Sequence, residues 1–492
     1  MNRQEETRNI RLEKLKKLKE LGIDAYPSES KRSKSIAQIK NDFSSIVKKN
    51  EPVFIVGRIN SIRKHGGSCF VDIRDSDDTF QLFIKKDTIG EKQFKGFVEL
   101  FDISDIIEAE GELFTSKRGE QSLMVKKVRL LSKALRAVPD DHYGLKDIET
   151  RLRKRYLDMV TNKETRELFV KKALFWQTIR QFMVKNDYLE VETPVLENVP
   201  GGAEAEPFIT HHNKLDRDFY LRISLELPLK RLLVGGYNKV FEIGRIFRNE
   251  GLSHEHLQDY TQLEFYWAYA DYNDLKKFIV KLFQDVIKKI NGSTQVTNQN
   301  KTIDFGNKWE TYDYYKLFKK YTKIDLSNTS LEELKKKADE LKIKHDSHIR
   351  KGRLIDLIYK KCVRPNLIEP GFLVDPPVEI EPLAKRCAKD PNRVQRLQVL
   401  AWGTELGKGF TELNDPLDQR KRFEEQMKLR EAGDKEAQLI DEDYIEAMEY
   451  GMPPNTGFGL SERLFSVLVD KPIRETVIFP PMKEEGQLII KN

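Results

Sequence analysis

Charged and aromatic side chains alternate along two neighbouring stretches within residues 240–269, and their spacing could build a binding site. Both stretches carry the strand signature of β-branched and aromatic residues, and a polar turn joins them. With a period of two, Arg248 and Glu250 share one face of the first strand, while Glu264 and Tyr266 share one face of the second. Gathering these charges on one side is unfavourable unless they meet partners. A phosphate would pair with the arginine, and a cationic substrate would pair with the acids. The alternative is a solvated outer face with cross-strand ion pairs.

A second pair of acids, Glu405 and Glu412, lies in residues 404–415, which we predict to form a hairpin with glycines at its turn. Such a hairpin could bring the two carboxylates together, and paired carboxylates repel unless a cation lies between them. A hard ion that prefers oxygen ligands, such as Mg²⁺, suits that place. Glu226 stands where a predicted strand turns into a helix, and its carboxylate could accept hydrogen bonds from an ammonium group.

Two glycine-containing segments could approach a ligand with their backbone. A glycine pair ending at Gly202 follows a proline, although a plain turn is the alternative. Residues 457–468 run from a Gly-x-Gly strand into a helix that starts at an acid–arginine pair, Glu462 and Arg463. The arginine at the helix start favours phosphate binding more strongly than the glycines alone do.

The composition limits the class of protein. The chain has 492 residues, enough for two or three domains, and its 39% hydrophobic and 34% charged residues describe a soluble globular protein. No apolar run approaches the roughly 20 residues of a membrane helix, and the charged start is not a signal peptide. The three cysteines have no paired spacing, which argues against disulfides or a thiolate zinc site and fits a reducing cytoplasm. A net charge of +7 permits a polyanionic partner without requiring one.

The N-terminal part begins with a basic helix and continues as short strands. The apolar residues of 8–22 fall mostly on one helix stripe, and lysines cover the other face, which is either solvated or binds a nucleic-acid backbone. From residue 52 the pattern changes to that of strands, with a helix-prone piece at 91–101. Five strands suggest a small Greek-key barrel of the OB type. We predict them at residues 54–62, 69–75, 79–84, 106–114 and 122–131.

Barrels of this type bind nucleic acid with exposed aromatic side chains that stack on bases, and with basic and amide groups that bind the backbone and base edges. Phe70 and Gln81 are candidates for stacking and for edge recognition, and Arg63 lies nearby in the sequence. Phe70 taken alone fits a core position better than an exposed one.

The remaining chain alternates helical and strand patterns. A long helix at 165–185 leads to a strand that ends at Pro194, and a further helix follows the charged hairpin at 271–290. Lysine-rich helical stretches later in the chain suggest an insertion that carries little information about function. Residues 475–482 are predicted to form the last strand.

Several of these segments resemble one enzyme family. Residues 240–251 resemble motif 2 of the class II aminoacyl-tRNA synthetases, and Phe-Arg-Asn-Glu-Gly at 247–251 with residues 263–272 is similar to the lysyl-tRNA synthetases in particular. The helix and strand that end at Pro194 resemble motif 1, and residues 457–468 resemble motif 3. The resemblance extends over nearly the whole chain.

The resemblance implies an α+β fold in which an N-terminal OB-type β-barrel precedes a class II synthetase catalytic domain, built on an antiparallel β-sheet flanked by helices. The implied domains are a basic helical extension over 1–50, an OB-fold anticodon-binding domain over 51–140, and a catalytic domain over 141–492 with a helical insertion at about 310–365. It also implies a lysine–tRNA ligase that makes lysyl-adenylate from lysine and ATP with Mg²⁺ and then charges tRNA(Lys). The enzyme would be a cytoplasmic homodimer formed through motif 1, with no membrane partner.

The resemblance assigns roles to individual residues. Arg248 would clamp the α-phosphate and the substrate carboxylate, and Arg463 the γ-phosphate. The lysine site would comprise Gly202, Glu226, Glu264, Tyr266, Phe410 and Glu412, with Glu226 at the α-amino group and Glu412 and Tyr266 at the ε-ammonium group. The ATP site would comprise Arg248, Glu250, His256, Tyr260, Glu405, Gly459 and Arg463, with Glu250 at the adenine edge and Tyr260 stacked on the ring. Glu405 and Glu412 would bind the metal, and Arg63, Phe70 and Gln81 the anticodon.

Three features depart from the lysyl pattern. Glu206 stands where a basic residue is usual, Lys408 stands where asparagine is usual, and the motif 3 loop is one glycine shorter.

Other functions fit less well. An aspartyl- or asparaginyl-tRNA synthetase would share the architecture but needs a cationic pocket, whereas Glu226, Glu264 and Glu412 make this one acidic. A catalytically silent nucleic-acid-binding protein would have no need of the arginines and acids above. A related enzyme that lysylates a protein typically lacks the barrel.

Overall fold

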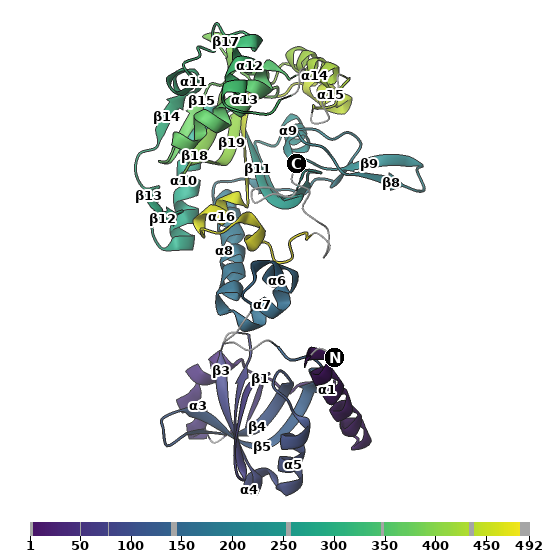
Figure 1. Ribbon diagram of the computed structural model, residues 1–492. Coiled ribbons are helices and arrows are strands. Elements are labelled where there is room, and N and C mark those ends of the chain that lie inside the picture. Colours follow the sequence, from purple (N-terminus) through teal and green to yellow (C-terminus); the bar gives the residue numbers. More distant parts are fainter. Residues whose placement is uncertain are drawn as a thin grey trace. The chain divides into compact units, whose positions relative to one another are not determined.

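The computed structural model describes residues 3–49, 51–76, 78–138, 145–251, 257–345, 349–431 and 437–482. The chain divides into two compact units, residues 1–166 and 167–492, and each is described by itself. Figure 1 shows the helices and strands of both units. No helix in the described ranges is long and apolar enough to cross a membrane.

The first unit is built around a closed five-stranded barrel with the strand order β1-β2-β3-β5-β4. Its strands are β1 (Val53–His65), β2 (Ser68–Arg74), β3 (Thr79–Lys85), β4 (Ile106–Thr115) and β5 (Gln121–Ser132). Side chains alternate along each strand, so that Cys69, Val71 and Ile73 of β2 are fully buried while the residues between them are only partly buried. The predicted five-stranded barrel is therefore confirmed, and its interior forms one apolar core.

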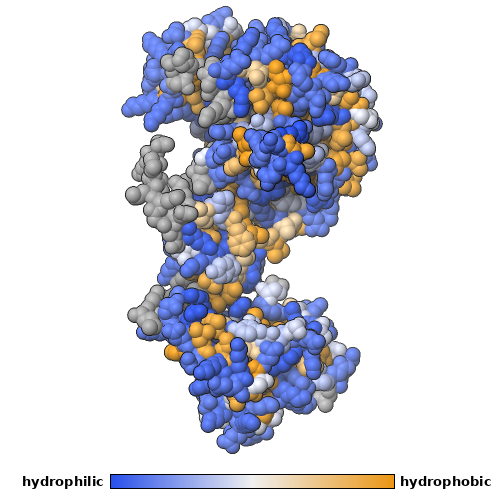
Figure 2. Space-filling view, turned by 90° about the vertical axis from the view of Figure 1, so that its right-hand side faces the viewer, coloured by the Kyte–Doolittle hydropathy of each residue, from blue (hydrophilic) through white to orange (hydrophobic). Residues whose placement is uncertain are grey.

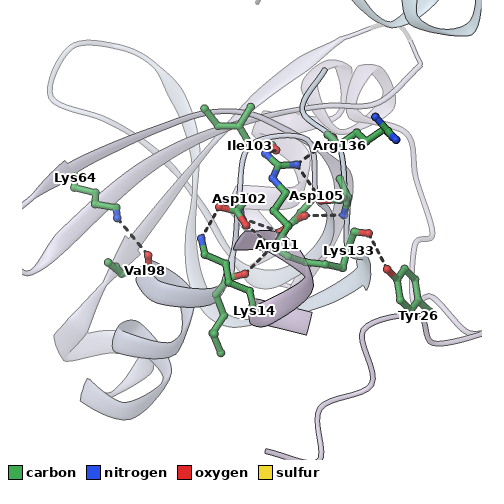
Figure 3. Close-up of polar contacts among 12 residues, drawn as sticks. Arg11, Lys14, Tyr26, Lys64, Val98, Asp102, Ile103, Asp105, Lys133 and Arg136 are labelled. Carbon is green, nitrogen blue, oxygen red and sulfur yellow. Dashed lines mark hydrogen bonds and ion pairs between the residues drawn. The ribbon is translucent and has the colours of Figure 1, made fainter. Parts of the chain in front are cut away.

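Helices surround the barrel and extend the first unit. They are α1 (Arg3–Glu20), α2 (Ile36–Asn41), α3 (Phe43–Lys49), α4 (Lys86–Ile89), α5 (Glu91–Leu100), α6 (Ile148–Arg153) and α7 (Arg155–Thr161). Residues on one side of α1 anchor it to the barrel: Leu18 enters the apolar core, and Lys14 pairs with Asp102 at 2.6 Å. The buried guanidinium of Arg11 donates to the carbonyls of Ile103, Ala134 and Arg136 at 2.9–3.1 Å (Figure 3).

The second unit is organised by an eight-stranded sheet in the order β14-β15-β18-β19-β20-β11-β10-β6. These strands are β14 (Glu310–Asp313), β15 (Gly371–Val374), β18 (Arg396–Ala401), β19 (Thr404–Thr411), β20 (Asn455–Ser461), β11 (Asp259–Ala268), β10 (Lys239–Phe247) and β6 (Leu189–Glu190). The central strands pair antiparallel, and only the two edge pairs, β14 with β15 and β6 with β10, are parallel. The expected antiparallel sheet flanked by helices is therefore confirmed.

The two faces of this sheet have different surroundings. One face contributes Phe265, Val399 and Phe458 to the main apolar core, which the helices α8 (Lys163–Lys185), α10 (Tyr272–Asn291) and α16 (Arg463–Leu468) cover (Figure 1). Successive residues of a strand face opposite sides of the sheet, so Tyr266 and Gly457 lie on the face away from this core. That opposite face carries the polar residues of the candidate site.

Further elements flank the sheet. They are β7 (Leu196–Glu197), β8 (Ile209–His212), β9 (Arg217–Leu221), α9 (Glu226–Val234), β12 (Gln295–Asn298), β13 (Lys301–Asp304), β16 (Arg386–Cys387), β17 (Asp390–Val394), α14 (Pro416–Glu431) and α15 (Glu442–Glu449). Residues 310–365, which the sequence analysis expected to be an insertion, hold α11 (Tyr314–Thr322), α12 (Leu331–Glu340) and α13 (Lys351–Cys362), which share a second apolar core.

Three predicted elements differ from the structure. Strand β10 ends at Phe247, so Arg248 and Glu250 lie in the connection to β11 rather than on the strand. Residues 404–411 form one strand without a turn, because glycines there allow close packing: a Cβ on Gly409 would lie 2.9 Å from Leu275 and would also overlap the carbonyl of Gly457. The expected last strand is a 3-10 turn, Ile473–Thr476, followed by irregular chain.

Candidate active site

A cavity of about 460 Å³ lies on the polar face of the eight-stranded sheet. Its walls come from α9, α13, the strands β11, β18, β19 and β20, and the connection between β10 and β11. All the predicted lysine-site and ATP-site residues that the structure describes line it: Gly202, Glu226, Arg248, Glu250, Tyr260, Glu264, Tyr266, Glu405, Phe410, Glu412, Gly459 and Arg463. His256 lies outside the described residues. Side chains from distant parts of the sequence therefore meet in one place.

One end of the cavity is acidic. Glu226, Glu264 and Glu412 are 6%, 3% and 1% exposed, so three carboxylates are buried together. Glu226 is the first residue of α9, and Glu264 lies within β11. Close packing makes room for them: Gly202 has a φ of +81°, and a Cβ there would lie 2.9 Å from the Cβ of Glu226.

The Glu264 carboxylate is held in one orientation by four donors. Its Oε1 accepts from the Ser224 hydroxyl at 2.8 Å, the Leu225 amide at 3.0 Å and the Gln262 side chain at 2.6 Å. Its Oε2 accepts from the Tyr266 hydroxyl at 3.2 Å. The carboxylate therefore has a fixed position at the acidic end of the cavity.

A buried cation, which the sequence analysis missed, lies between the other two acids. The Lys230 ammonium is 2.6 Å from Glu226 Oε1 and also forms an ion pair with Glu412. Its side chain is 0% exposed. Lys230 follows Glu226 by four residues, so both lie on one face of α9, and this spacing was the available signal.

Aromatic rings enclose this ion-paired group. The Lys230 ammonium lies 5.5 Å from the centre of the Phe410 ring, 5.8 Å from that of Tyr266 and 6.0 Å from that of Tyr444. Burial raises the pKa of Glu226 to about 7, while Lys230 opposes that rise and Glu264 adds to it. Burial and nearby carboxylates also raise the pKa of Tyr266 well above its ordinary value, so its phenol stays protonated as a donor.

The other end of the cavity holds cations and aromatic groups. Arg248 and Arg463 both line it, although they come from residues more than two hundred positions apart in the chain. The Arg248 guanidinium donates to the carbonyl of Ile223 at 3.3 Å and lies 5.8 Å from the centre of the Tyr260 ring. Positive charge at one end and negative charge at the other suit an elongated ligand that carries an anion and a cation.

The two acids predicted to share a metal have different partners. Glu405 accepts a hydrogen bond from the amide of Gln398, whereas Glu412 is paired with Lys230. Among the described residues, no group of three or more His, Cys, Asp or Glu side chains could hold a metal ion. Glu405 reaches the cavity because β19 has an extra residue, Leu406, at a register shift opposite Val399 and Leu400.

The residues that depart from the lysyl pattern also have defined contacts. The Lys408 ammonium lies 3.2 Å from Glu381 Oε2, and Arg396 lies 3.4 Å from the same oxygen. Nearby carboxylates thus raise the pKa of Lys408 although burial lowers it. The carbonyl of Glu206 accepts from the amide of Asn249 at 2.7 Å.

Helix α13, in the segment expected to be an insertion, contributes to the cavity, which its lysine-rich sequence did not indicate. Arg353, Asp356 and Lys360 of α13 line the wall, and Tyr359 of the same helix donates to Gln398 at 2.9 Å. Charged residues spaced three and four apart along a helix usually form a solvated face. Only the structure therefore shows that these three residues line the cavity.

The three predicted anticodon residues lie together on the outer face of the barrel. Arg63 of β1 is opposite Phe70 of β2, and Asp72 is opposite Gln81 of β3. Arg63 forms an ion pair with Asp72. Phe70 is partly exposed and lies outside the barrel core. The sequence analysis favoured a core position for Phe70 taken alone, and that prediction is wrong. Sequence reasoning missed Phe83, whose ring stacks on Phe70 at 4.6 Å.

Comparison with known proteins is consistent with this geometry. The family described as class II tRNA synthetases (D, K and N) matches residues 147–483, and the OB-fold nucleic acid binding domain of the tRNA anti-codon type matches residues 53–131. The lysine–tRNA ligase of Thermoanaerobacter pseudethanolicus is 43% identical over 97% of this chain and 96% of its own length. The lysine–tRNA ligases of Moorella thermoacetica and Listeria monocytogenes are each 42% identical, over 97% and 96% of this chain and 98% and 97% of their own lengths.

Proposed function

The chain belongs to the lysine–tRNA ligases of the class II aminoacyl-tRNA synthetases, and from that membership we propose how its residues divide the work. As a lysine–tRNA ligase it activates lysine with ATP and transfers the lysyl group to tRNA. The observation that carries the assignment of residues is the burial of three carboxylates at one end of a cavity whose other end holds two arginines.

The acidic end binds the substrate lysine. Glu412 and Tyr266 accept the ε-ammonium group, with Phe410 packed against the methylene chain, and Glu226 accepts the α-ammonium group. Glu264 completes the acidic site from its fixed position. Selection follows from length and charge, because a buried acid at the end of the site favours a long cation and leaves shorter or neutral side chains without a partner. An aspartate or asparagine substrate would meet Lys230 and Lys408 there, and both are already paired with acids of the protein.

The arginine end binds ATP. Glu250 contacts the adenine edge, Tyr260 stacks on the ring, and Gly459 lets the backbone of β20 approach the nucleotide. Arg248 bridges the α-phosphate and the substrate carboxylate, and Arg463 binds the γ-phosphate. We keep His256 in this set on family grounds alone.

The reaction needs no nucleophilic side chain. An oxygen of the lysine carboxylate attacks the α-phosphorus, a new P–O bond forms, and the bond to the bridging oxygen breaks to release pyrophosphate. A ribose hydroxyl at the 3′ end of tRNA then attacks the lysyl carbonyl carbon, and AMP leaves. Both reactants of the first step are anions, so arginine charge beside the phosphorus is the main requirement.

A magnesium ion would fit beside Glu405. That carboxylate lines the cavity, and Mg²⁺ is commonly held by one or two carboxylates together with substrate phosphates. Glu412 does not fit as a second ligand of the same ion, because its carboxylate is paired with Lys230 beside the proposed ε-ammonium site, whereas Glu405 is bonded to Gln398. The bound ion would supply positive charge to the phosphate oxygens.

The barrel binds the tRNA anticodon. Phe70 offers a ring for stacking, already backed by Phe83, while Arg63 and Gln81 supply cationic and amide groups beside it. We place the enzyme in the cytoplasm with its tRNA substrate.

The active form is a homodimer assembled through the motif 1 segment. Apolar side chains are exposed in that segment and just after it: Val184 (57%) and Leu189 (47%) precede Pro194, and Leu196 (46%) and Ile209 (62%) follow it. Figure 2 faces the side toward which β8 and β9 project in Figure 1, and hydrophobic residues gather there in patches among hydrophilic ones. Exposed apolar patches of this kind often mark interfaces. Sedimentation of the wild type and of Leu196→Glu tests this, since a monomeric wild type would contradict it.

The decisive experiment is ATP–pyrophosphate exchange with lysine, aspartate, asparagine and arginine supplied singly. Exchange with lysine alone, lost in Glu264→Gln and Glu412→Gln, is the expected result. Exchange driven by aspartate or asparagine, or unaffected by both substitutions, would contradict the assigned lysine site. Charging of tRNA with lysine then tests the second step.

A further inference from the structure

Lys230 has no role in the assignments above, yet it contacts two of the acids on which they depend. Its ammonium is 2.6 Å from Glu226 and also paired with Glu412, and its side chain is 0% exposed. The rings of Phe410, Tyr266 and Tyr444 lie around it, each with its centre within 6.0 Å of the ammonium. A cation in such a place is part of the site and not of the surface.

Burying an ammonium is unfavourable unless carboxylates compensate it, and burying carboxylates is unfavourable unless a cation does. Glu226 and Lys230 are four residues apart, about one turn of α9, so each side chain compensates the buried charge of the other. The acid at 412 joins them from the far end of β19. Lys230 therefore fixes where two substrate-binding carboxylates stand before any substrate arrives.

We propose that Lys230 is a positioning residue that sets the charge of the lysine site and thereby its selectivity. At the acidic end the ammonium of Lys230 offsets one of the three buried carboxylates, and the others face the two ammonium groups of a lysine substrate. An amino acid with a neutral side chain would leave a buried acid without a cationic partner. This inference rests on the proposed lysine site and adds a determinant to it.

Loss of the ammonium would change the state of the acids. The groups that face Glu226 are Lys230 on its own helix, Glu264 and Tyr266 from β11, Lys408 and Glu412 from and beyond β19, and Tyr444 from α15. Burial raises the pKa of both Glu226 and Glu412, and Lys230 is the largest influence that opposes the rise. Without the ammonium the pKa of both acids rises further, so each keeps its proton to a higher pH and pairs less well with a substrate ammonium group.

The test is ATP–pyrophosphate exchange by the full-length chain and by Lys230→Met, with lysine and with norleucine, which lacks the ε-ammonium group. At pH 7 the KM for lysine is expected to rise about tenfold or more, because each pH unit of displaced titration changes the ionised fraction about tenfold. The KM for ATP should stay within about threefold, and the preference for lysine over norleucine should fall. The midpoint of the pH profile of kcat/KM for lysine should move upward by about one unit or more. Lys230→Gln, a neutral donor, carries the same test if Lys230→Met does not fold.

Lys133→Met is the matched control. Lys133 is equally buried and pairs with two acids, Asp102 at 2.6 Å and Asp105 at 2.8 Å, but it lies in the barrel unit (Figure 3). It should lower the unfolding temperature without moving the KM for lysine or the pH midpoint. An unchanged lysine KM and midpoint in the Lys230 variants would overturn the inference, as would equal losses for lysine and ATP. A wild type that fails to use lysine at all would instead contradict the proposed function.

Discussion

Gln398 and Glu405 meet across β18 and β19, and the amide of Gln398 donates to the carboxylate of Glu405 inside the cavity. The amide cannot turn over freely, because its oxygen accepts from the Tyr359 hydroxyl at 2.9 Å. Glu405 therefore has a neutral donor beside it where a second carboxylate would make a stronger site for a divalent cation.

Replacing that amide by a carboxylate should strengthen magnesium binding. In Gln398→Glu two acids would face each other and repel, and Mg²⁺ would relieve the repulsion while the contact with Tyr359 is kept. We expect the Mg²⁺ concentration that gives half-maximal pyrophosphate exchange to fall several-fold. Gln395→Glu adds the same charge outside the cavity and should not change it. The same Mg²⁺ requirement in both variants would remove Glu405 from the proposed metal site.

The pH dependence of lysine activation should follow the ionisation of the Glu226 carboxyl. Its pKa is raised to about 7 by burial, so the carboxyl is protonated below that pH and ionised above it. A cationic substrate needs the ionised form, and kcat/KM for lysine is therefore expected to rise with pH up to about 7 and then level off. Initial rates of exchange between pH 5.5 and 9 measure this. In Glu226→Gln the rise should disappear along with most of the affinity for lysine; a rise that persists with the same midpoint would assign it to another group.

The strands of the barrel and the helix after the charged hairpin were predictable from local patterns, whereas the antiparallel sheet of the second unit was expected from the family resemblance. Period-two alternation along β1 to β5 identifies strands in any such sequence, and the N-cap position of Asp271 identifies the start of α10. The site was predictable only where a motif marked it. Lys230 and the residues of α13 reach the cavity through tertiary packing, and Glu405 reaches it through a bulge at Leu406, none of which changes the local pattern.

The misjudged elements have a common cause as well. Phe70 fits a core by residue type, but its position between Cys69 and Val71 in an alternating strand turns it outward. The glycines of β19 suggested a turn, whereas they are required by the close approach of β20. Residue type alone therefore gave wrong predictions at positions whose surroundings are set by neighbouring strands.

Glu197 should limit stability at alkaline pH. Its Oε2 is buried without a hydrogen-bond partner among the described residues, and burial raises the pKa of this carboxyl from 4.5 to about 8. Between those values the folded state keeps a proton that the unfolded state has lost, so stability falls as pH rises through that window. Glu197→Gln should remove this decline and stabilise the protein at pH 8, by on the order of 2 kcal/mol. Chemical denaturation at pH 5 and pH 8 measures the difference; an equal effect at both would contradict the pKa.

The stacked pair Phe70 and Phe83 should matter for tRNA and not for amino-acid activation. Stacking of a base on an aromatic side chain contributes about 1–3 kcal/mol, so Phe70→Ala should raise the KM for tRNA roughly 5- to 150-fold. Phe83→Ala should produce a smaller rise, because Phe83 supports Phe70 from behind at 4.6 Å. Lysine-dependent pyrophosphate exchange, which needs no tRNA, serves as the control for both. Equal charging by the wild type and Phe70→Ala would contradict the anticodon assignment.

The lysine site should require glycine at position 457 because there is no room for a side chain there, and not because the backbone conformation needs glycine. A Cβ at this position of β20 would lie 2.6 Å from the Glu412 carboxylate and would overlap the Tyr266 ring. Gly457→Ala must therefore displace one of the two groups proposed to hold the ε-ammonium, and the KM for lysine should rise at least tenfold with a smaller change for ATP. Gly459→Ala is the informative comparison: its Cβ would meet nothing closer than 3.5 Å, and because Gly459 faces the nucleotide it should affect ATP more than lysine. The reverse pattern, with Gly457→Ala weakening ATP and sparing lysine, would place the amino acid elsewhere in the cavity.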